Sequence, residues 1–175
     1  MKKTNVQNLP FIDLNSQQDL IRENLNIAIN KVLSHGEFIM GPEVLRVEEI
    51  LAERSNTNYC ITCGSGTDAL TIPLMAANIS KDDVVFVPSF TFTSSAEVIA
   101  LRGATPFFVD INHRTFNMDP ESLELSIKEC IRSGGSPKAI ITVDLFGQPV
   151  DFDSIISIAE KYNLFSELLV LDSLL

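Results

Sequence analysis

The feature that most restricts the fold is a regular alternation of strand-like and helix-like segments over residues 58–172. Short apolar runs such as VVFV and AIITV recur, and between them apolar residues return every three or four positions. Strands separated by helices usually pair in parallel and are covered on both faces. The alternation therefore predicts an α/β protein with a mostly parallel sheet and helices on both faces. The strands are expected at residues 58–63, 83–88, 105–110, 138–146 and 167–172.

Helices are expected between these strands and also before the first one. Apolar residues at helical spacing indicate a helix over residues 16–33, ended by Gly36, and a second helix over residues 42–54. Between the strands, helices are expected at residues 66–78, 92–102, 119–132 and 151–162, with Asp119 capping the third. Pro73 falls inside the first of these, where a proline costs about 3 kcal/mol unless the helix kinks.

Length and charge limit the ligands that this chain can be expected to bind. With 175 residues, of which 45% are hydrophobic, residues 1–175 are expected to form a single domain. A formal net charge of -10 gives no reason to expect nucleic acid or an anionic membrane as a partner, so a small metabolite is the expected ligand. The N-terminal lysines precede no apolar signal region, and no stretch reaches the ~18 apolar residues of a membrane span, so a cytoplasmic location is expected.

The three cysteines, Cys60, Cys63 and Cys130, are expected to be structural. Cys60 and Cys63 form a C-x-x-C pair, which can be a redox pair or half of a zinc site. No second pair and no paired histidine completes a tetrahedral ligand set, so no metal site is expected.

Three junctions that follow strands contain unusual residues, and ligands of open α/β sheets collect at such places. At the first, Gly64, Ser65, Gly66 and Thr67 precede a helix and could hold a phosphate through backbone amides and hydroxyls. A tight turn with Ser65 as a helix cap explains the same residues. The run matches neither a P-loop nor a dinucleotide fingerprint, which disfavours an unrelated nucleotide-binding module.

The other two junctions combine aromatic residues with turn residues. Phe90 and Phe92 stand among serines and threonines after the second expected strand, where they could stack on a planar ring or pack in the core. In the third junction, Gly147 and Pro149 turn the chain, and Phe146 is expected to pack against the loop.

Taken together, these stretches resemble the sugar-nucleotide aminotransferases of the DegT/DnrJ/StrS type, which are pyridoxal phosphate enzymes of fold type I. The resemblance covers about residues 9 to 164, and several segments occur in the family's order and spacing. They are LPFIDLNSQQ, VLSHGEFIMGPEVLRVEEILAE, GSGTDAL, VFVPSFTFTSSAEVIALRGATPFFVDI, TFNMDPESLE and VDLFGQPVDFDSIISIAEKYNL.

The resemblance implies a cofactor, a reaction and specific contacts. Gly66 and Thr67 would hold the phosphate of pyridoxal 5'-phosphate, and Phe92 would stack on its pyridine ring. The segment 36–42 matches a stretch near the substrate side. The family moves an amino group, usually from glutamate, to a nucleotide-linked keto-sugar, and its active sites lie at a homodimer interface.

The end of the sequence departs from the family pattern. The family's acid on the pyridine nitrogen has one candidate, Asp172, which lies about three residues late and is not followed by the family's glutamine. The family's Schiff-base lysine has no counterpart, so no catalytic residue is assigned. We therefore expect the N-terminal portion of a large domain, with the C-terminal small domain absent. Such a chain could act with a complementing chain or be an inactive remnant with at most weak cofactor binding.

Overall fold

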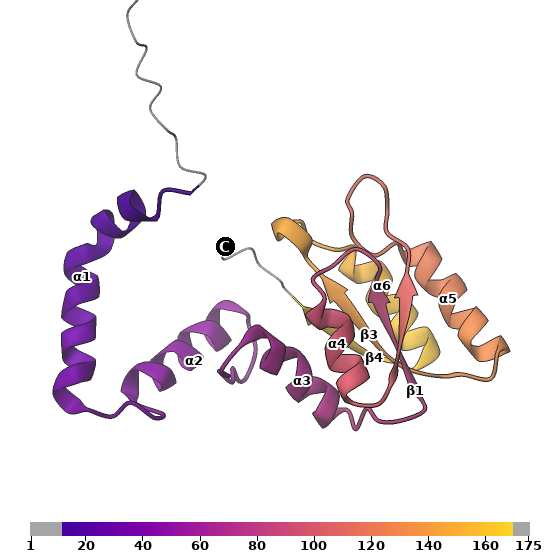
Figure 1. Cartoon of the computed structure of the whole chain (residues 1–175), viewed down its shortest axis with the longest axis horizontal. Helices are drawn as coiled ribbons and strands as arrows, with labels where there is room; N and C mark the ends of the chain where they lie inside the picture. Colours follow the sequence, from indigo (N-terminus) through magenta and orange to yellow (C-terminus); the bar gives the residue numbers. More distant parts are fainter. Residues whose placement is uncertain (1–11, 170–175) are drawn as a thin grey trace, which may run out of the picture. The chain divides into compact units, whose positions relative to one another are not determined.

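The computed structural model describes residues 12–169 (Figure 1). Contacts between residues divide the chain into two compact units, one ending at Thr62 and the other beginning at Cys63. Each unit is considered by itself. Between residues 12 and 169, no helix is both long enough and apolar enough to cross a membrane.

The first unit consists of two helices, α1 (Leu14–His35) and α2 (Pro42–Arg54). Gly36 ends α1 as expected: it has a φ of 71° and donates its amide to the Val32 carbonyl at 3.0 Å. Pro42 is the first residue of α2, where its fixed φ suits a helix start. The apolar stripes that the sequence predicts on both helices contain no fully buried residue.

A cluster of charged side chains joins α1 to the start of α2. The Glu43 carboxylate lies 3.0 Å from Lys31 Nζ and 3.1 Å from His35 Nε2. The amide of Glu37 donates to His35 Nδ1 at 3.0 Å, so Nε2 carries the proton that points to Glu43. The hydrogen bond from Lys31 is the main reason that the pKa of Glu43 lies below its ordinary value.

The second unit is built on a four-stranded sheet in which every pairing is parallel. The strand order is β2-β1-β3-β4, which places β1 and β3 at the centre. Both central strands are buried on two faces, as expected for apolar runs in a covered parallel sheet. The strands are β1 (Asp83–Pro88), β2 (Thr105–Val109), β3 (Ser136–Val143) and β4 (Phe165–Leu169).

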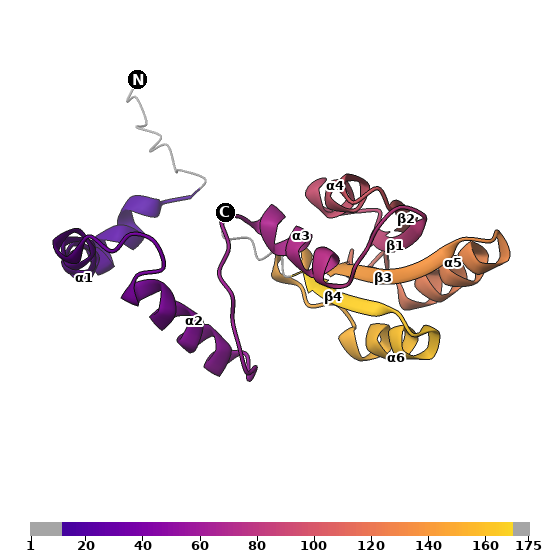
Figure 2. The same ribbon diagram turned by 90° about the horizontal axis from the view of Figure 1, so that it is seen from below.

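Helices cover the sheet on both faces, which Figure 2 shows with the sheet nearly edge-on. On one face, α3 (Gly66–Ala76) and α4 (Ser94–Leu101) enclose an apolar cluster with alternate residues of β1 and β3. On the other face, α5 (Pro120–Arg132) and α6 (Phe152–Tyr162) enclose a second cluster. The predicted α/β class is confirmed, and so is the cap on α5, where Asp119 accepts from the Ser122 amide at 2.9 Å.

One expected strand is wrong. Residues 58–63 form no strand in the part of the chain that the structure describes, and the first strand of the sheet begins at Asp83. An apolar run becomes a strand only when a neighbouring backbone pairs with its amides and carbonyls. Within residues 12–169, the outer strand β2 pairs with β1 and the outer strand β4 pairs with β3, so residues 58–63 pair with neither edge of the sheet.

The helix α3 continues through Pro73, because the Ala77 amide donates to the Pro73 carbonyl at 2.8 Å. Proline provides no amide for the Ala69 carbonyl one turn earlier. We therefore expect Pro73→Ala to raise the free energy of unfolding by about 1 to 3 kcal/mol, measured by thermal and urea denaturation. Pro120→Ala is the matched control, since Pro120 occupies a first helical position where no amide is needed. A Tm for Pro73→Ala equal to that of the wild type would contradict the prediction.

A second prediction concerns Glu124 on α5, which forms an ion pair with Lys128 on the same helix and another with Lys161 on α6. Glu124 lies 2.6 Å from Lys161 Nζ and 3.0 Å from Lys128 Nζ, and it accepts from the Tyr162 hydroxyl at 3.0 Å. These contacts, that of Lys161 first, lower the pKa of Glu124 from 4.5 to about 2. A carboxylate whose pKa is lower in the folded state than in the unfolded state stabilises the fold at pH values above its unfolded-state pKa. This stabilisation is lost as the pH falls through the folded-state pKa.

The stability difference between wild type and Glu124→Gln should therefore be largest above pH 4.5 and should disappear as the pH falls to about 2. Urea denaturation at a series of pH values measures it. Glu121→Gln is the control on the same helix. A difference that stays constant down to pH 2 would show that the ion pairs do not act on stability.

Candidate functional site

The loops that follow the parallel strands meet at one edge of the sheet, because all the strands run in the same direction. We call this the carboxyl edge. It comprises residues 89–93 after β1, residues 110–119 after β2 and residues 144–151 after β3. Open α/β sheets bind ligands at this edge.

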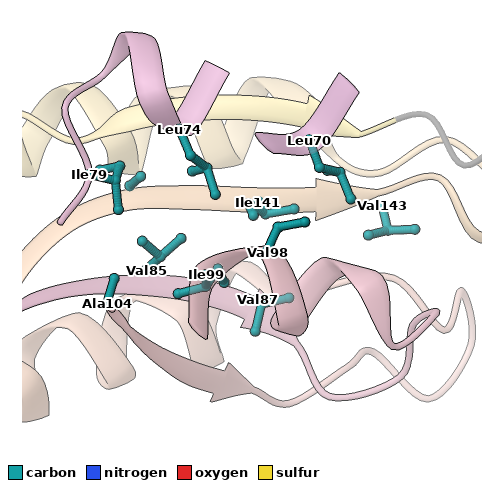
Figure 3. Close-up of a cluster of buried hydrophobic side chains, with 11 residues drawn as sticks. Leu70, Leu74, Ile79, Val85, Val87, Val98, Ile99, Ala104, Ile141 and Val143 are labelled. Atoms are coloured by element: carbon teal, nitrogen blue, oxygen red, sulfur yellow. The ribbon is translucent and has the colours of Figure 1, made fainter. Parts of the chain in front are cut away.

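The start of α3 also lies at the carboxyl edge, as Figure 3 shows. Leu70, in the first half of the helix, packs at the Val143 end of β3. Ile79, beyond the end of α3, lies at the opposite end of the cluster with Ala104. The helix therefore runs against the strand direction, and its amide end, which carries partial positive charge, faces the ligand-binding edge.

Ser65 caps α3, and the next two amides remain available. The Ser65 hydroxyl accepts from the Asp68 amide at 3.1 Å, and the Ser65 carbonyl accepts from the Ala69 amide at 3.0 Å. The amides of Gly66 and Thr67 precede these bonds and have no acceptor within the helix. A Cβ placed on Gly66 would meet no atom within 4 Å, so the space over this turn is open. The turn is capped as the simpler interpretation expects, and it still offers two amides to an anion.

The loop after β1 presents its phenylalanines to solvent. Phe90 is 44% exposed and Phe92 is 63% exposed, so neither packs in the core. The serines at the start of α4 are buried, and the hydroxyls of Thr91 and Ser95 lie 3.0 Å apart. The loop is anchored through its hydroxyls, and the exposed Phe92 ring is accessible to a planar ligand.

The loop after β3 differs from its expected structure. Phe146 was expected to pack against the loop, but its side chain is 74% exposed and its φ is 58°. The ring meets the Phe90 ring with centroids 6.4 Å apart. The loop itself is held by Asp144, whose carboxylate accepts from the Val150 amide at 2.9 Å.

Four carboxylates at this edge, those of Asp110, Asp119, Asp144 and Asp151, are engaged by nearby amides. Asp110 accepts from the Ile111 amide at 2.8 Å, and Asp151 caps α6 by accepting from the Ser154 amide at 3.3 Å. Asp119 and Asp144 make the equivalent bonds described above. The acidic residues therefore shape the loops and share their charge with local donors. Amide groups and aromatic rings remain as the chemistry available to a ligand.

Two residues at this edge have no signal in the sequence. Phe116 lies in the loop after β2, is 51% exposed and has a φ of 61°. Asn117 is 3% exposed and donates from Nδ2 to the Gln148 carbonyl at 2.8 Å, which ties the loop after β2 to the loop after β3. Hydrophobic periodicity does not predict a hydrogen bond between distant loops. A phenylalanine does not indicate a left-handed backbone, because bulky residues rarely adopt one.

The remaining candidate residues lie elsewhere. All three cysteines are free thiols, and Cys130 is buried in the cluster beneath α5. Residues 12–169 contain no group of three or more histidine, cysteine or acidic side chains that could hold a metal ion. Lys81 and Lys138 lie near the amino ends of β1 and β3, and Lys128 and Lys161 lie on α5 and α6. Asp172 lies outside the described residues.

The arrangement fits a cofactor with a phosphate and a flat ring. Open amides at the start of α3 suit the phosphate, and exposed rings on the adjacent loop suit the ring. A family model for the DegT/DnrJ/EryC1/StrS aminotransferases matches residues 19–172. The chain belongs to this family.

Relatives of the chain are considerably longer than it is. It is 46% identical over 156 residues to a UDP-2-acetamido-2-deoxy-3-oxo-D-glucuronate aminotransferase of Pseudomonas aeruginosa, covering 89% of this chain and 42% of the relative. A crystal structure of a DegT DnrJ EryC1 StrS aminotransferase from Brucella abortus matches 91% of the chain and 43% of its own length, with 46% identity and a TM-score of 0.90. NtdA from Bacillus subtilis with bound cofactor PMP matches 96% of the chain and 38% of its own length, with 30% identity and a TM-score of 0.82.

The cap of α3 gives a prediction about the stability of this turn. Ser65→Ala removes the hydroxyl that accepts from the Asp68 amide, so we expect the free energy of unfolding to fall by about 1 kcal/mol. Ser65→Gly is the matched variant and should cost only a few tenths of a kcal/mol, because glycine is itself a good capping residue. Urea denaturation of both variants measures the difference. A free energy of unfolding for Ser65→Ala equal to that of the wild type would show that the cap does not stabilise the turn.

Proposed function

We propose that this chain provides the cofactor-phosphate site and the ring-stacking face of a pyridoxal phosphate aminotransferase. The reaction is the transfer of an amino group from glutamate to a nucleotide-linked keto-sugar, and UDP is the proposed nucleotide. The observation that carries the proposal is the pair of open amides of Gly66 and Thr67 at the amide end of α3, at the same edge as exposed Phe92. Family membership and the UDP-sugar relative support it.

The amides of Gly66 and Thr67 hold the phosphate, aided by the helix dipole. The absence of a side chain at Gly66 matters because it lets phosphate oxygens approach the backbone closely. Phe92 packs against one face of the pyridine ring and excludes water from it. The cofactor, when bound, supplies an electron sink for breaking bonds at the carbon that carries the amino group.

The remaining expectations from the sequence, on the pyridine-nitrogen acid, the oligomeric state and the domain, are part of the same proposal. Asp172 is proposed as the acid that pairs with the pyridine nitrogen, where a carboxylate keeps that nitrogen protonated. The active protein is proposed to be a cytoplasmic homodimer, and residues 1–175 to be the N-terminal portion of the large domain.

Titration of the purified chain with pyridoxal 5'-phosphate and with pyridoxal, followed by isothermal titration calorimetry, tests the phosphate site. We expect binding that is tighter than that of pyridoxal, which lacks the phosphate. Gly66→Ala should weaken it about tenfold, because the added methyl group occupies the space of a phosphate oxygen. The same methyl group meets no protein atom, so the Tm should not fall. Equal affinity for pyridoxal and its phosphate would contradict the proposed site.

The stacking residue and the reaction need separate measurements. Phe92→Leu should weaken cofactor binding, whereas Phe108→Leu, which removes a 56% exposed ring from β2, should not. For the reaction, release of 2-oxoglutarate from glutamate is measured with the cofactor-loaded chain mixed with candidate complementing chains, because the family's Schiff-base lysine has no assigned counterpart here. Cofactor binding without release in any of these mixtures would favour the non-catalytic alternative.

A further inference from the structure

Three phenylalanines from three separate loops form one exposed aromatic cluster at the carboxyl edge. The central ring, Phe90, has its centroid 5.9 Å from that of Phe116 and 6.4 Å from that of Phe146. The rings are tilted or edge-on to one another, the geometry that aromatic pairs prefer. Their side chains are 44%, 51% and 74% exposed, respectively. We call these three residues the phenylalanine platform.

Two of the three residues are held in a backbone conformation that phenylalanine rarely adopts. Phe116 has a φ of 61° and Phe146 has a φ of 58°, both in the left-handed region. For a bulky side chain this conformation is an outlier, and such strain concentrates at ligand sites. A glycine or asparagine would relieve the strain at either position. The presence of a phenylalanine at both positions therefore needs an explanation.

The two strained loops are braced against each other beneath the rings. Buried Asn117, next to Phe116, donates to the carbonyl of Gln148, two residues after Phe146. Its own loop is closed by bonds from the Asn112 amide to the Asn117 carbonyl at 2.9 Å and from the Phe116 amide to the Asn112 carbonyl at 2.8 Å. Asn117 Oδ1 has no hydrogen-bond partner within residues 12–169. Buried acceptors are generally paired, and an ordered water is one partner that can satisfy such an atom.

We propose that the phenylalanine platform stacks on the base of the nucleotide-linked substrate, a uracil ring. This inference rests on the proposed function. The platform is uncharged and aromatic, which suits the flat face of a base and not the charged diphosphate. Phe90 is two residues from Phe92 on the same loop, so base and cofactor ring would be held by one segment. A substrate anchored by its base presents its sugar to the reacting centre at a lower entropic cost.

A second copy of this chain is the other occupant that such a surface could have. Protein contacts of that kind bury several hundred Å² on each partner and make the Tm dependent on concentration. The braced and strained loops argue for the small ligand, because strain at single residues serves positioning better than it serves a broad apolar contact.

Binding of UMP to the purified chain, with ribose 5-phosphate as the probe that lacks a base, tests the proposal by calorimetry and ligand-observed NMR. We expect UMP to bind at least about tenfold more tightly than ribose 5-phosphate. Phe146→Asn should weaken UMP binding about 5- to 150-fold, the range for loss of one stacking residue. It should leave the Tm unchanged or raise it by about 2 to 4 °C, because asparagine tolerates the left-handed backbone.

Phe90→Leu, which removes the central ring without touching a strained position, should also weaken UMP binding. Phe108→Leu is the control for loss of an exposed ring elsewhere on this unit and should leave binding unchanged. UMP and ribose 5-phosphate binding with equal affinity would overturn the proposal. So would loss of self-association in Phe146→Asn, seen by sedimentation without any change in UMP binding, because it would assign the surface to a second copy.

The phenylalanine platform and the proposed function are tested by independent measurements, so one can fail without the other. UMP binding is measured without cofactor, and cofactor binding is measured without nucleotide. Cofactor binding that depends on Gly66, together with no preference for UMP, would overturn the platform and leave the aminotransferase proposal standing. Platform-dependent UMP binding without cofactor binding would do the reverse.

Discussion

The common direction of the four strands is the constraint on which the second unit depends. In β1, Val85 and Val87 face one apolar cluster, and Val84 and Phe86 face the other. Burial of both faces fixes the register, because a shift by one residue would exchange the two sets of side chains. Parallel pairing then brings the loops after β1, β2 and β3 to one edge. The exposed rings and the braced loops meet there for that reason, and the capped turn at Gly66 lies at the same edge because α3 runs against the strand direction.

Much of this arrangement can be predicted from local patterns. The apolar runs at β1, β2 and β3 and the caps at Ser65 and Asp119 are visible in the sequence, since each depends on neighbouring residues. The expected strand at residues 58–63 shows the limit of that approach. Its alternation of apolar residues is compatible with a strand, but pairing depends on a partner that local sequence does not specify. The positions of Phe90 and Phe92 were likewise open, because base rates of burial favour packing over exposure.

The least predictable part of the site is the pair of loops that carry Phe116 and Phe146. Both residues adopt a left-handed backbone, which sequence alone associates with glycine or asparagine. The bond from Asn117 to the Gln148 carbonyl joins positions 31 residues apart, so no short motif reports it. Sequence-based reasoning fails here because the local preferences of phenylalanine are overridden by tertiary contacts, a pattern that is typical of functional sites.

The negative net charge of the chain opposes the binding of an anion such as a phosphate. A net charge of -10 repels a phosphate at long range, but salt screens such repulsion beyond about 8 Å at physiological ionic strength. At short range, the carboxylates of Asp110, Asp144 and Asp151 are bound by nearby amides, and the amides of Gly66 and Thr67 point from the positive end of α3. We therefore propose that local dipoles decide what binds at this turn. If backbone geometry holds the phosphate, changes in surface charge should matter less to binding than a single methyl group at Gly66.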